Sequence, residues 1–151
     1  MTGGEANGPA ATGLIVTADG TPPKVAIVGG SASGALVASL LCGQFGCKTI
    51  VTPTGEAVLG LLRSETRVDL VLIDLSVPDM EGIVAVQLIR AMGARGALPV
   101  VALVSDRTEV TDNRARAAGF SAVVVKPYSP RELFGAMEHA LARAAQRALE
   151  A

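Results

Sequence analysis

One acidic residue, Asp74, stands where parallel-sheet proteins most often carry out their chemistry. It closes an apolar run that has no alternation, at residues 68–74, and it precedes a loop that contains Pro78 and Gly82. Such a run is typical of a strand that is buried on both faces, and the ligands of open parallel sheets gather at the carboxyl ends of the strands. The sequence therefore makes Asp74 the first candidate for a functional role.

The elements that would position Asp74 follow from the hydrophobic pattern, in which short Val/Ile runs alternate with longer helical stretches from Lys24 onward. The pattern predicts strands at 24–28, 48–52, 69–74, 99–103 and 122–125, and helices at 32–44, 55–64, 82–93, 107–118 and 130–148. Strict alternation of five strands with five helices requires right-handed crossovers. The expected fold class is therefore α/β, with a parallel sheet and helices on both faces.

Length and composition indicate one domain. The chain has 151 residues, of which half are apolar, and a net charge of -1. Residues 1–22, rich in Gly, Ala, Thr and Pro, are expected to form a flexible tail, and residues 23–151 the domain with an extended last helix. The balanced charge argues against a nucleic-acid partner. Because no apolar run is long enough to span a bilayer and the N-terminus does not resemble a secretory signal, we expect a cytoplasmic protein without a membrane partner.

Three residues with metal-binding or redox potential lack the companions that such roles need. Cys42 and Cys47 flank a short turn, and without a further Cys or a nearby His they are interpreted as small core hydrophobes. His139 lies on the last helix without a second ligand, and we expect it to face solvent. The end of that helix extends beyond what packing on a sheet requires, so it is a candidate for contact with a partner.

The stretch from residue 24 to about 143 resembles the receiver domain of two-component response regulators. The resemblance rests on Asp74 at a strand end, on the loop LSVPDMEG, on Leu98-Pro99 opening the fourth strand and on VVVKPYSPREL at 123–133. It implies a flavodoxin-like (βα)5 three-layer sandwich with strand order 2-1-3-4-5. It also implies that Asp74 accepts a phosphoryl group from a histidine kinase, that Lys126 pairs with the phosphoryl oxygens, and that the Lys126–Pro127 bond is cis.

The chain departs from the receiver pattern at the metal site. Receivers place two acidic residues at the end of strand 1, where this sequence has Gly29 and Gly30. Mg²⁺ requires oxygen ligands and supports phosphoryl transfer by neutralising the equatorial oxygens. With Asp74 as the one remaining carboxylate, opposed by Lys126, we expect weak Mg²⁺ binding at most. Aspartates at 79 and 106 and the glutamate at 81 are alternative ligands, and Asp substitutions at both glycines would create a metal site if the backbone accepts side chains.

The two positions of the family's conformational switch also differ. The position of the switch hydroxyl is Val104, and that of the switch aromatic is Val123. Ser105 would substitute for the hydroxyl if the strand end is bulged by one residue. A valine side chain cannot donate a hydrogen bond to a phosphoryl group, and it cannot take the part of an aromatic ring that moves inward after the hydroxyl. The conformational switch of the family is therefore expected to be absent.

We therefore interpret the chain as a degenerate receiver, or pseudo-receiver, that is no enzyme and signals by binding another protein. The expected partners are a histidine kinase, a phosphotransferase or another signalling protein. The expected surface for such a partner consists of the helix at 107–118, the strand at 122–125 and the last helix, and a homodimer through the same face is a further expectation. Three arginines of the helix at 107–118 are candidates for that face: Arg107, Arg114 and Arg116.

Two alternatives remain open. A competent receiver would accept phosphate at Asp74 despite the missing acids. An anion- or nucleotide-binding domain would use the GGSASG loop at 29–34, which imitates a dinucleotide fingerprint. Two residues argue against nucleotide binding. Ser31 occupies the position of the middle glycine of the fingerprint, and Thr52 occupies the position where an acid that binds the ribose is expected.

Overall fold

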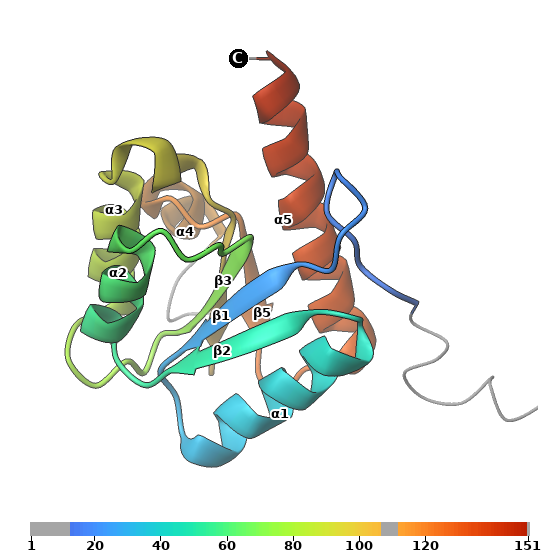
Figure 1. Cartoon of the computed structure of the whole chain (residues 1–151). Coiled ribbons are helices and arrows are strands. Elements are labelled where there is room, and N and C mark those ends of the chain that lie inside the picture. The colour runs from blue at the N-terminus through green and yellow to red at the C-terminus, as the bar shows by residue number, and fades with distance from the viewer. Residues whose placement is uncertain (1–12, 107–111, 151) are drawn as a thin grey trace, which may run out of the picture.

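The sheet has five parallel strands in the order β2-β1-β3-β4-β5, as predicted (Figure 1). The protein is described by a computed structural model that covers residues 13–106 and 112–150. The elements in chain order are β1 (Lys24–Val28), α1 (Ala32–Gln44), β2 (Lys48–Thr52), α2 (Gly55–Arg63), β3 (Leu70–Asp74), α3 (Gly82–Arg90), the 3-10 helix η3 (Gly93–Ala97), β4 (Val100–Val104), α4 (Asp112–Ala118), β5 (Ala122–Val125) and α5 (Pro130–Glu150). This is the three-layer α/β sandwich that the strand and helix pattern predicts.

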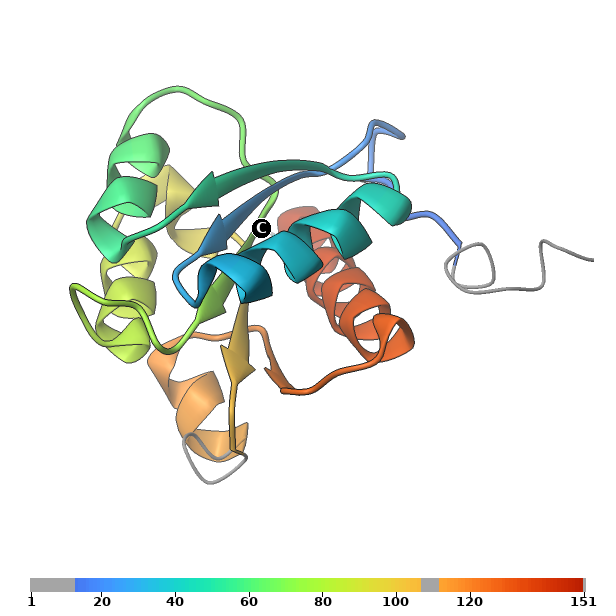
Figure 2. The ribbon, with the colours of Figure 1, turned by 90° about the horizontal axis from the view of Figure 1, so that it is seen from below.

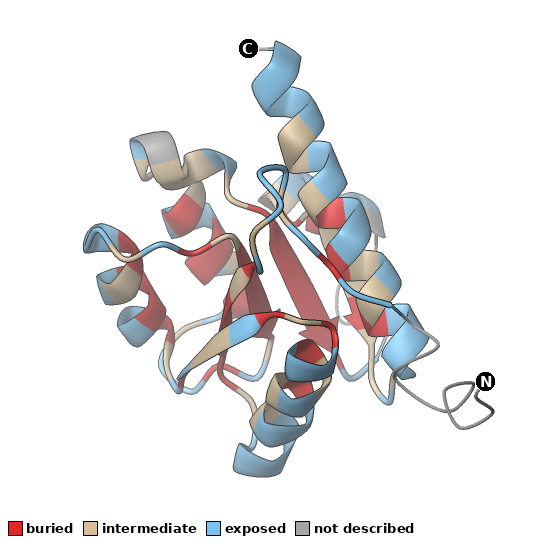
Figure 3. Ribbon diagram, turned by 45° about the vertical axis from the view of Figure 1, so that its right-hand side comes forward, coloured by how far each residue is buried: buried red, intermediate tan, exposed pale blue. Residues whose placement is uncertain are grey.

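Successive strand residues point to opposite faces of the sheet and so build two separate cores. On β3, Val71 and Ile73 belong to the core beneath α2, α3 and α4, whereas Leu70 and Leu72 belong to the core beneath α1 and α5. The two helical layers lie on either side of the sheet in Figure 2. Figure 3 shows that the central strands are buried along their length. Burial on both faces explains why the strands read as continuous apolar runs.

Local signals in the sequence set several helix ends. Thr54 caps α2 by accepting a hydrogen bond from the backbone N–H of Ala57 at 3.0 Å. At the start of α5, the N–H of Glu132 donates to the Ser129 hydroxyl while the N–H of Ser129 donates to the Glu132 carboxylate, at 3.1 and 2.8 Å. This reciprocal pair is a capping box. The predicted starts of both helices are confirmed.

The predicted element boundaries shift at a few positions. The helix expected at 82–93 ends at Arg90 and is followed by η3, whose first residue, Gly93, has φ of +65°. The fourth strand begins at Val100 rather than at Pro99, since proline has no N–H to donate to a sheet. The last helix continues to Glu150. Of the helix predicted at 107–118, residues 107–111 lie outside the described part of the chain.

The segment before β1, within the predicted tail, contacts the domain through Ile15. Ile15 is only 4% exposed and belongs to the core beneath α1 and α5. Its N–H donates to the carbonyl of Phe45 at 2.9 Å. Further along, Asp19 and Arg67 form an ion pair at 3.8 Å. The sequence signal for this packing is the short apolar cluster Leu14–Val16.

None of the helices in the described residues has the length and apolar character that crossing a bilayer would require.

Candidate functional site

Asp74 is the last residue of β3 and lies at the carboxyl edge of the sheet. Its neighbour across the sheet is Leu103 of β4, and the preceding residue, Ile73, pairs with Val28 of β1. Asp74 is 7% exposed and, with Thr52, is one of two buried polar residues in the described part of the chain. A buried carboxylate requires partners, because burial without them costs several kcal/mol.

Lys126 supplies the first partner. It follows β5 directly, and its Nζ lies 2.6 Å from Oδ2 of Asp74. The N–H of Lys126 donates to the carbonyl of Val104 at 2.7 Å, so the main chain of the lysine is held at the end of β4. The Lys126–Pro127 bond is cis, as predicted. The two charged side chains that the sequence singled out therefore meet in an ion pair.

Ser76 supplies the second partner, which the sequence reasoning missed. Its N–H and its hydroxyl both donate to Oδ1 of Asp74, at 2.9 and 2.6 Å. An aspartate whose side chain accepts the N–H two residues later forms an Asx-turn, so the spacing Asp-Leu-Ser was the available signal. Both oxygens of Asp74 are thus engaged by groups of the chain itself.

These contacts set the protonation state of Asp74. Burial by itself would raise the pKa of the carboxyl, but the hydrogen bonds from Lys126 and Ser76, together with the charge of Lys126, bring it below the ordinary value. Asp74 is therefore a carboxylate at neutral pH, and its charge is already balanced by Lys126.

Gly29 and Gly30 follow β1 and turn the chain beside Asp74. Both have left-handed backbones, with φ of +72° and +81°. A Cβ added at Gly30 would lie 2.8 Å from Oδ2 of Asp74, and one at Gly29 would lie 3.0 Å from a methyl carbon of Val77. The condition for creating a metal site by Asp substitutions is therefore not met, because side chains at these positions are both strained and crowded.

The remaining acidic candidates do not complete a magnesium site. Asp79 accepts hydrogen bonds from the N–H groups of Gly55 and Glu56 at 2.8 and 3.0 Å, and these bonds lower the pKa of its carboxyl. Asp79 thus caps α2. Glu81 is the exposed N-cap residue of α3 and makes no side-chain cap bond. Within residues 13–106 and 112–150, no three His, Cys, Asp or Glu side chains come together as metal ligands. The residues present do not fit the oxygen-rich set that Mg²⁺ requires.

The switch positions are filled by valines that serve the core. Val104 is fully buried at the end of β4, and Val123 packs against the same core from β5. The β4–β5 register runs without interruption to Val104 opposite Val125. The described pairing therefore lacks the bulge that would bring Ser105 into the hydroxyl position.

The glycine loop leads into a capped helix. The hydroxyl of Ser31 accepts a hydrogen bond from the N–H of Gly34 at 3.0 Å, so the protein itself satisfies one of the amides that an anion would use. Thr52, at the position expected for a ribose-binding acid, is buried, and its hydroxyl donates to the carbonyl of Ile27 at 3.1 Å.

The other singled-out residues lie away from Asp74. Cys42 and Cys47 are buried free thiols, and burial raises their pKa values to about 12 and about 11, as expected for core hydrophobes. His139 is exposed on α5. Of the predicted interaction face, Arg114 and Arg116 are exposed on α4, and Arg107 lies outside the described residues.

The fold and the Asp74–Lys126 pair together define a receiver-type α/β domain. Residues 9–138 match the response regulator receiver domain family, and the chain belongs to this family of two-component phosphorelay signalling.

Sequence comparison with curated proteins supports the same family. The chain is 30% identical over 120 residues to the DNA-binding response regulator MtrA of Mycobacterium tuberculosis, an alignment that covers 80% of this chain and 51% of MtrA. It is 29% identical to the sensor protein GacS of Pseudomonas syringae (74% of this chain, 12% of GacS) and 27% identical to the probable histidine kinase 4 of rice (63% and 11%). The alignments thus span about half the length of MtrA and less than an eighth of the length of GacS or of the rice kinase.

Solved structures share the fold. The chemotaxis response regulator CheY4 of Vibrio cholerae superposes with a TM-score of 0.66 at 22% identity, covering 84% of this chain and 98% of CheY4. The receiver domain of the sensor histidine kinase PA1611 of Pseudomonas aeruginosa, described with a magnesium ion coordinated in its active-site cleft, superposes with a TM-score of 0.73 at 19% identity (81% and 99%).

Proposed function

We propose that this chain is a degenerate receiver domain that acts mainly as a protein-interaction module, with weak or absent Mg²⁺-dependent phosphorylation at Asp74. It performs no catalysis of its own. Its partner is a histidine kinase, a phosphotransferase or another protein of the same signalling class.

The observation that carries this proposal is the closed environment of the Asp74 carboxylate. Lys126 takes one oxygen and Ser76 takes the other, while Gly29 and Gly30 provide no ligand and no room for one. A carboxylate attacks a charged phosphoryl donor poorly unless a cation offsets the negative charge, so phosphorylation here is expected to be slow.

The direct test is chemical phosphorylation. The protein is incubated with acetyl phosphate, or with beryllofluoride, at millimolar Mg²⁺, and adducts are followed by intact mass and by NMR. A receiver domain that these reagents modify is the positive control, and the Asp74→Asn variant reports any modification elsewhere on the chain. We expect little or no adduct under conditions that modify the control extensively. Efficient, Mg²⁺-dependent and Asp74-dependent modification would contradict the proposal.

The α1 helix supports a role in protein binding. It carries no charged residue along its 13 positions, and its outer face exposes three large aliphatic side chains. These are Leu36, Val37 and Leu40, which are 58%, 49% and 60% exposed. A surface helix normally presents a polar outer face, so an apolar one indicates an interaction site.

The α1 face can be tested with purified histidine-kinase and phosphotransferase domains. Leu40→Glu is expected to weaken binding at least about tenfold, since a charge enters an apolar contact. Val84→Glu is the matched control, because Val84 is 40% exposed on α3. Asp74→Asn should leave binding nearly unchanged. An equal loss in the Leu40 and Val84 variants, or a large loss in the Asp74 variant, would refute this assignment.

A competent phospho-accepting receiver is the second candidate. The retained 2.6 Å contact between Lys126 and Asp74 favours it, because a lysine at this distance would also reach a phosphoryl group on the aspartate. The same acetyl phosphate experiment separates the two functions. Phosphate-dependent spectral changes that extend from Asp74 into β4 and β5 would favour the competent receiver.

A further inference from the structure

A small cavity lies at the edge of the sheet that is opposite to Asp74. It is formed where α4 and α5 meet the beginnings of β4 and β5, and its volume is about 30 Å³. Its wall includes Pro99, directly before β4, and Ser121, directly before β5. Because β3, β4 and β5 are parallel, the beginnings of β4 and β5 lie far from the carboxyl end of β3. The cavity is therefore separate from the Asp74 site.

Three arginines surround this cavity. Arg116 comes from α4, and Arg143 and Arg147 lie one turn apart on α5. All three residues are exposed. In the part of the chain that the structure describes, none of the three forms an ion pair, and no acidic residue lines the cavity. Like charges that gather without a counter-charge create a positive potential, which attracts an anion.

A fourth guanidinium, from Arg90, adds positive charge beside these three. It donates hydrogen bonds to the carbonyls of Gly119 and Leu98, so the chain itself fixes its position. Burial lowers the pKa of Arg90, and the charge of Arg147 lowers it further. Arg147 therefore lies within electrostatic reach of a guanidinium that is already occupied. Arg90 strengthens the positive potential but is not a free donor.

Ser121 supplies a hydroxyl at the same cavity. Its oxygen accepts a hydrogen bond from the N–H of Val100 at 3.1 Å, and its own N–H donates to the carbonyl of Val100 at 2.7 Å. These two bonds hold Ser121 in place and leave the hydroxyl hydrogen to donate. Among the described residues, no group accepts that hydrogen. Since guanidinium groups cannot accept hydrogen bonds, the polar side chains of this wall offer donors to a ligand.

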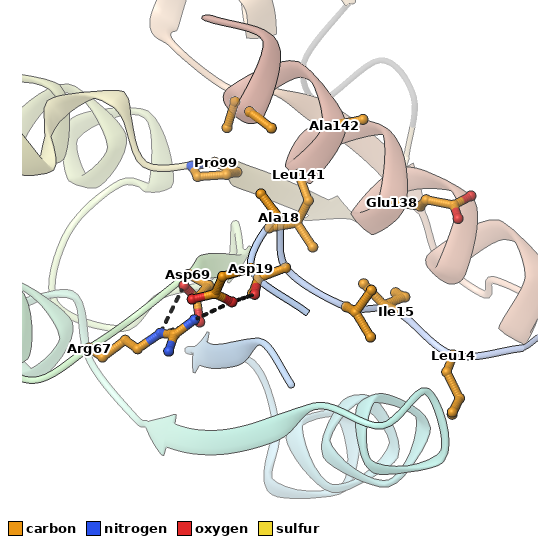
Figure 4. Close-up of a pocket in the computed structure, with 14 residues that line it drawn as sticks. Leu14, Ile15, Ala18, Asp19, Arg67, Asp69, Pro99, Glu138, Leu141 and Ala142 are labelled. Atoms are coloured by element: carbon orange, nitrogen blue, oxygen red, sulfur yellow. Dashed lines mark hydrogen bonds and ion pairs between the residues drawn. The ribbon is translucent and has the colours of Figure 1, made fainter. Parts of the chain in front are cut away.

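The acidic residues of α5 do not line this cavity. Glu132 belongs to the capping box at the start of the helix. Glu150 accepts a hydrogen bond from Gln146 at 3.2 Å. Glu138 lines a different groove, on the side of α5 that faces the segment before β1 (Figure 4). The helix itself therefore brings no carboxylate into the cavity.

That second groove limits the size of the anion. It has a volume of about 560 Å³ and is lined by three carboxylates against the guanidinium of Arg67. The carboxylates are those of Asp19, Asp69 and Glu138. A long polyanion such as a nucleic acid would meet these negative charges on a chain whose net charge is already -1. The positive potential is local, so a compact anion fits it better.

We propose that this cavity binds a phosphate-class oxyanion, either inorganic phosphate or the phosphoryl group of a small molecule, between Arg116, Arg143 and Arg147. The volume, about that of one water molecule in the liquid, has room for the oxygens of one compact group and not for a larger organic body. A tetrahedral dianion presents oxygens to several guanidinium groups from different directions. A planar carboxylate has two oxygens and one charge, so it matches three guanidinium groups less well.

The test is an NMR titration of the full chain with inorganic phosphate at about pH 8, where phosphate is mainly a dianion. Sodium chloride is lowered in step, which keeps the ionic strength constant. We expect saturable shifts of the amides of Val100 and Ser121, with a dissociation constant of about 1 mM or less. Acetate should bind at least about tenfold more weakly. The absence of a saturable shift, or acetate that binds as tightly as phosphate, would overturn the proposal.

Methyl phosphate separates the two sources of the ligand. Equal shifts with methyl phosphate and inorganic phosphate would show that the site takes a phosphoryl group on a small molecule. Binding of inorganic phosphate alone would assign the site to the free anion. Shifts confined to residues 29–34 would place the anion in the glycine loop and would contradict the proposal. None of these results depends on whether Asp74 can be phosphorylated.

Substitutions decide whether the arginines act as a site or only through the total charge. Arg143→Gln and Arg147→Gln should each raise the dissociation constant for phosphate at least about tenfold. Arg143→Lys keeps the charge but loses the paired donors, so its loss should be smaller. Arg131→Gln is the matched control, because Arg131 is exposed in the first turn of α5 and does not line the cavity. An equal loss in Arg131→Gln and Arg143→Gln would refute a local site.

Discussion

Replacing Lys126 with methionine is expected to destabilise the fold at neutral pH by about 2 kcal/mol. Removing one member of a buried ion pair typically costs about 3–5 kcal/mol, whereas exposed pairs contribute about 0–1 kcal/mol. The Asp74–Lys126 pair lies between these limits, because the side chains are 10% and 32% exposed. Ser76 would still donate two hydrogen bonds to the stranded carboxylate, which keeps the loss below the upper limit.

A double-mutant cycle isolates this interaction. The free energy of unfolding is measured with urea for the wild type, Lys126→Met, Asp74→Asn and the double variant. Asp74→Asn should cost less than Lys126→Met, because an unpaired lysine can reach solvent and an unpaired buried aspartate cannot. The coupling energy is expected to be about 1–2 kcal/mol.

The pH dependence gives a second readout. The pKa of Asp74 is lower in the folded protein than its ordinary value, so its stabilisation is fully present above that value and is lost as the pH falls through the folded pKa. In Lys126→Met the folded pKa should rise, so acid should destabilise this variant less than it destabilises the wild type. A coupling energy below about 0.5 kcal/mol at neutral pH, or one that persists unchanged at about pH 3, would refute this account of the site.

Four further substitutions, at three residues, test other parts of the structure. Gly30→Ala should lower the free energy of unfolding by about 2 kcal/mol, since a left-handed backbone and the Asp74 oxygen both oppose a Cβ, and Gly30→Asp should bring no gain in Mg²⁺ affinity by calorimetry. Arg90→Met should cost about 2 kcal/mol in urea unfolding, because its guanidinium donates to the carbonyl of Gly119 from two nitrogens, at 2.9 and 2.6 Å. Ile15→Ala should cost about 2–4 kcal/mol in the same assay if the segment before β1 belongs to the core.

The changes at Gly30 and Ile15 each have a control. Gly60→Ala is the partner of the Gly30 change, since a Cβ at Gly60 meets nothing within 4 Å and the residue is helical, so it should stabilise slightly. Leu14→Ala, at a residue that is 69% exposed, should change stability far less than Ile15→Ala. Equal effects at residues 14 and 15 would show that the segment is not packed, and tight Mg²⁺ binding by Gly30→Asp would show that the turn can rebuild a metal site.

The fold could be predicted from the sequence because the hydrophobic pattern and the capping residues of each element indicate the same secondary structure. The run at residues 70–74 could be buried only between two layers of helices, and the capping residues Thr54 and Ser129 marked helix starts within one residue. The contact of Ile15 with the core was not predicted, because the composition of residues 13–22 is that of a linker. The attachment of this segment depends on one buried isoleucine, for which the short cluster Leu14–Val16 is the only local signal, and on a main-chain hydrogen bond to Phe45, which has none.

The sequence predicted the two charged residues of the site but not the contacts and backbone conformation around them. The pattern pointed to Asp74 and Lys126, but their contact at 2.6 Å joins the ends of β3 and β5, which lie on either side of β4. The role of Ser76 was missed, although an Asx-turn has a local signature. The backbone handedness of Gly29 and Gly30 could not be read from the sequence, because glycine adopts either sign of φ without a preference that its neighbours reveal. The capping of α2 by Asp79 links loops that are 24 residues apart.

The N–H groups at the start of α2 donate to the Asp79 carboxylate, and these hydrogen bonds attach the loop after β3 to a neighbouring helix. An engineer who wished to give this protein a working cation pocket could not do so one side chain at a time. Both turns that border Asp74 would have to be transplanted together from a metal-binding homologue, and the tether at Asp79 would have to be kept or replaced in the same graft.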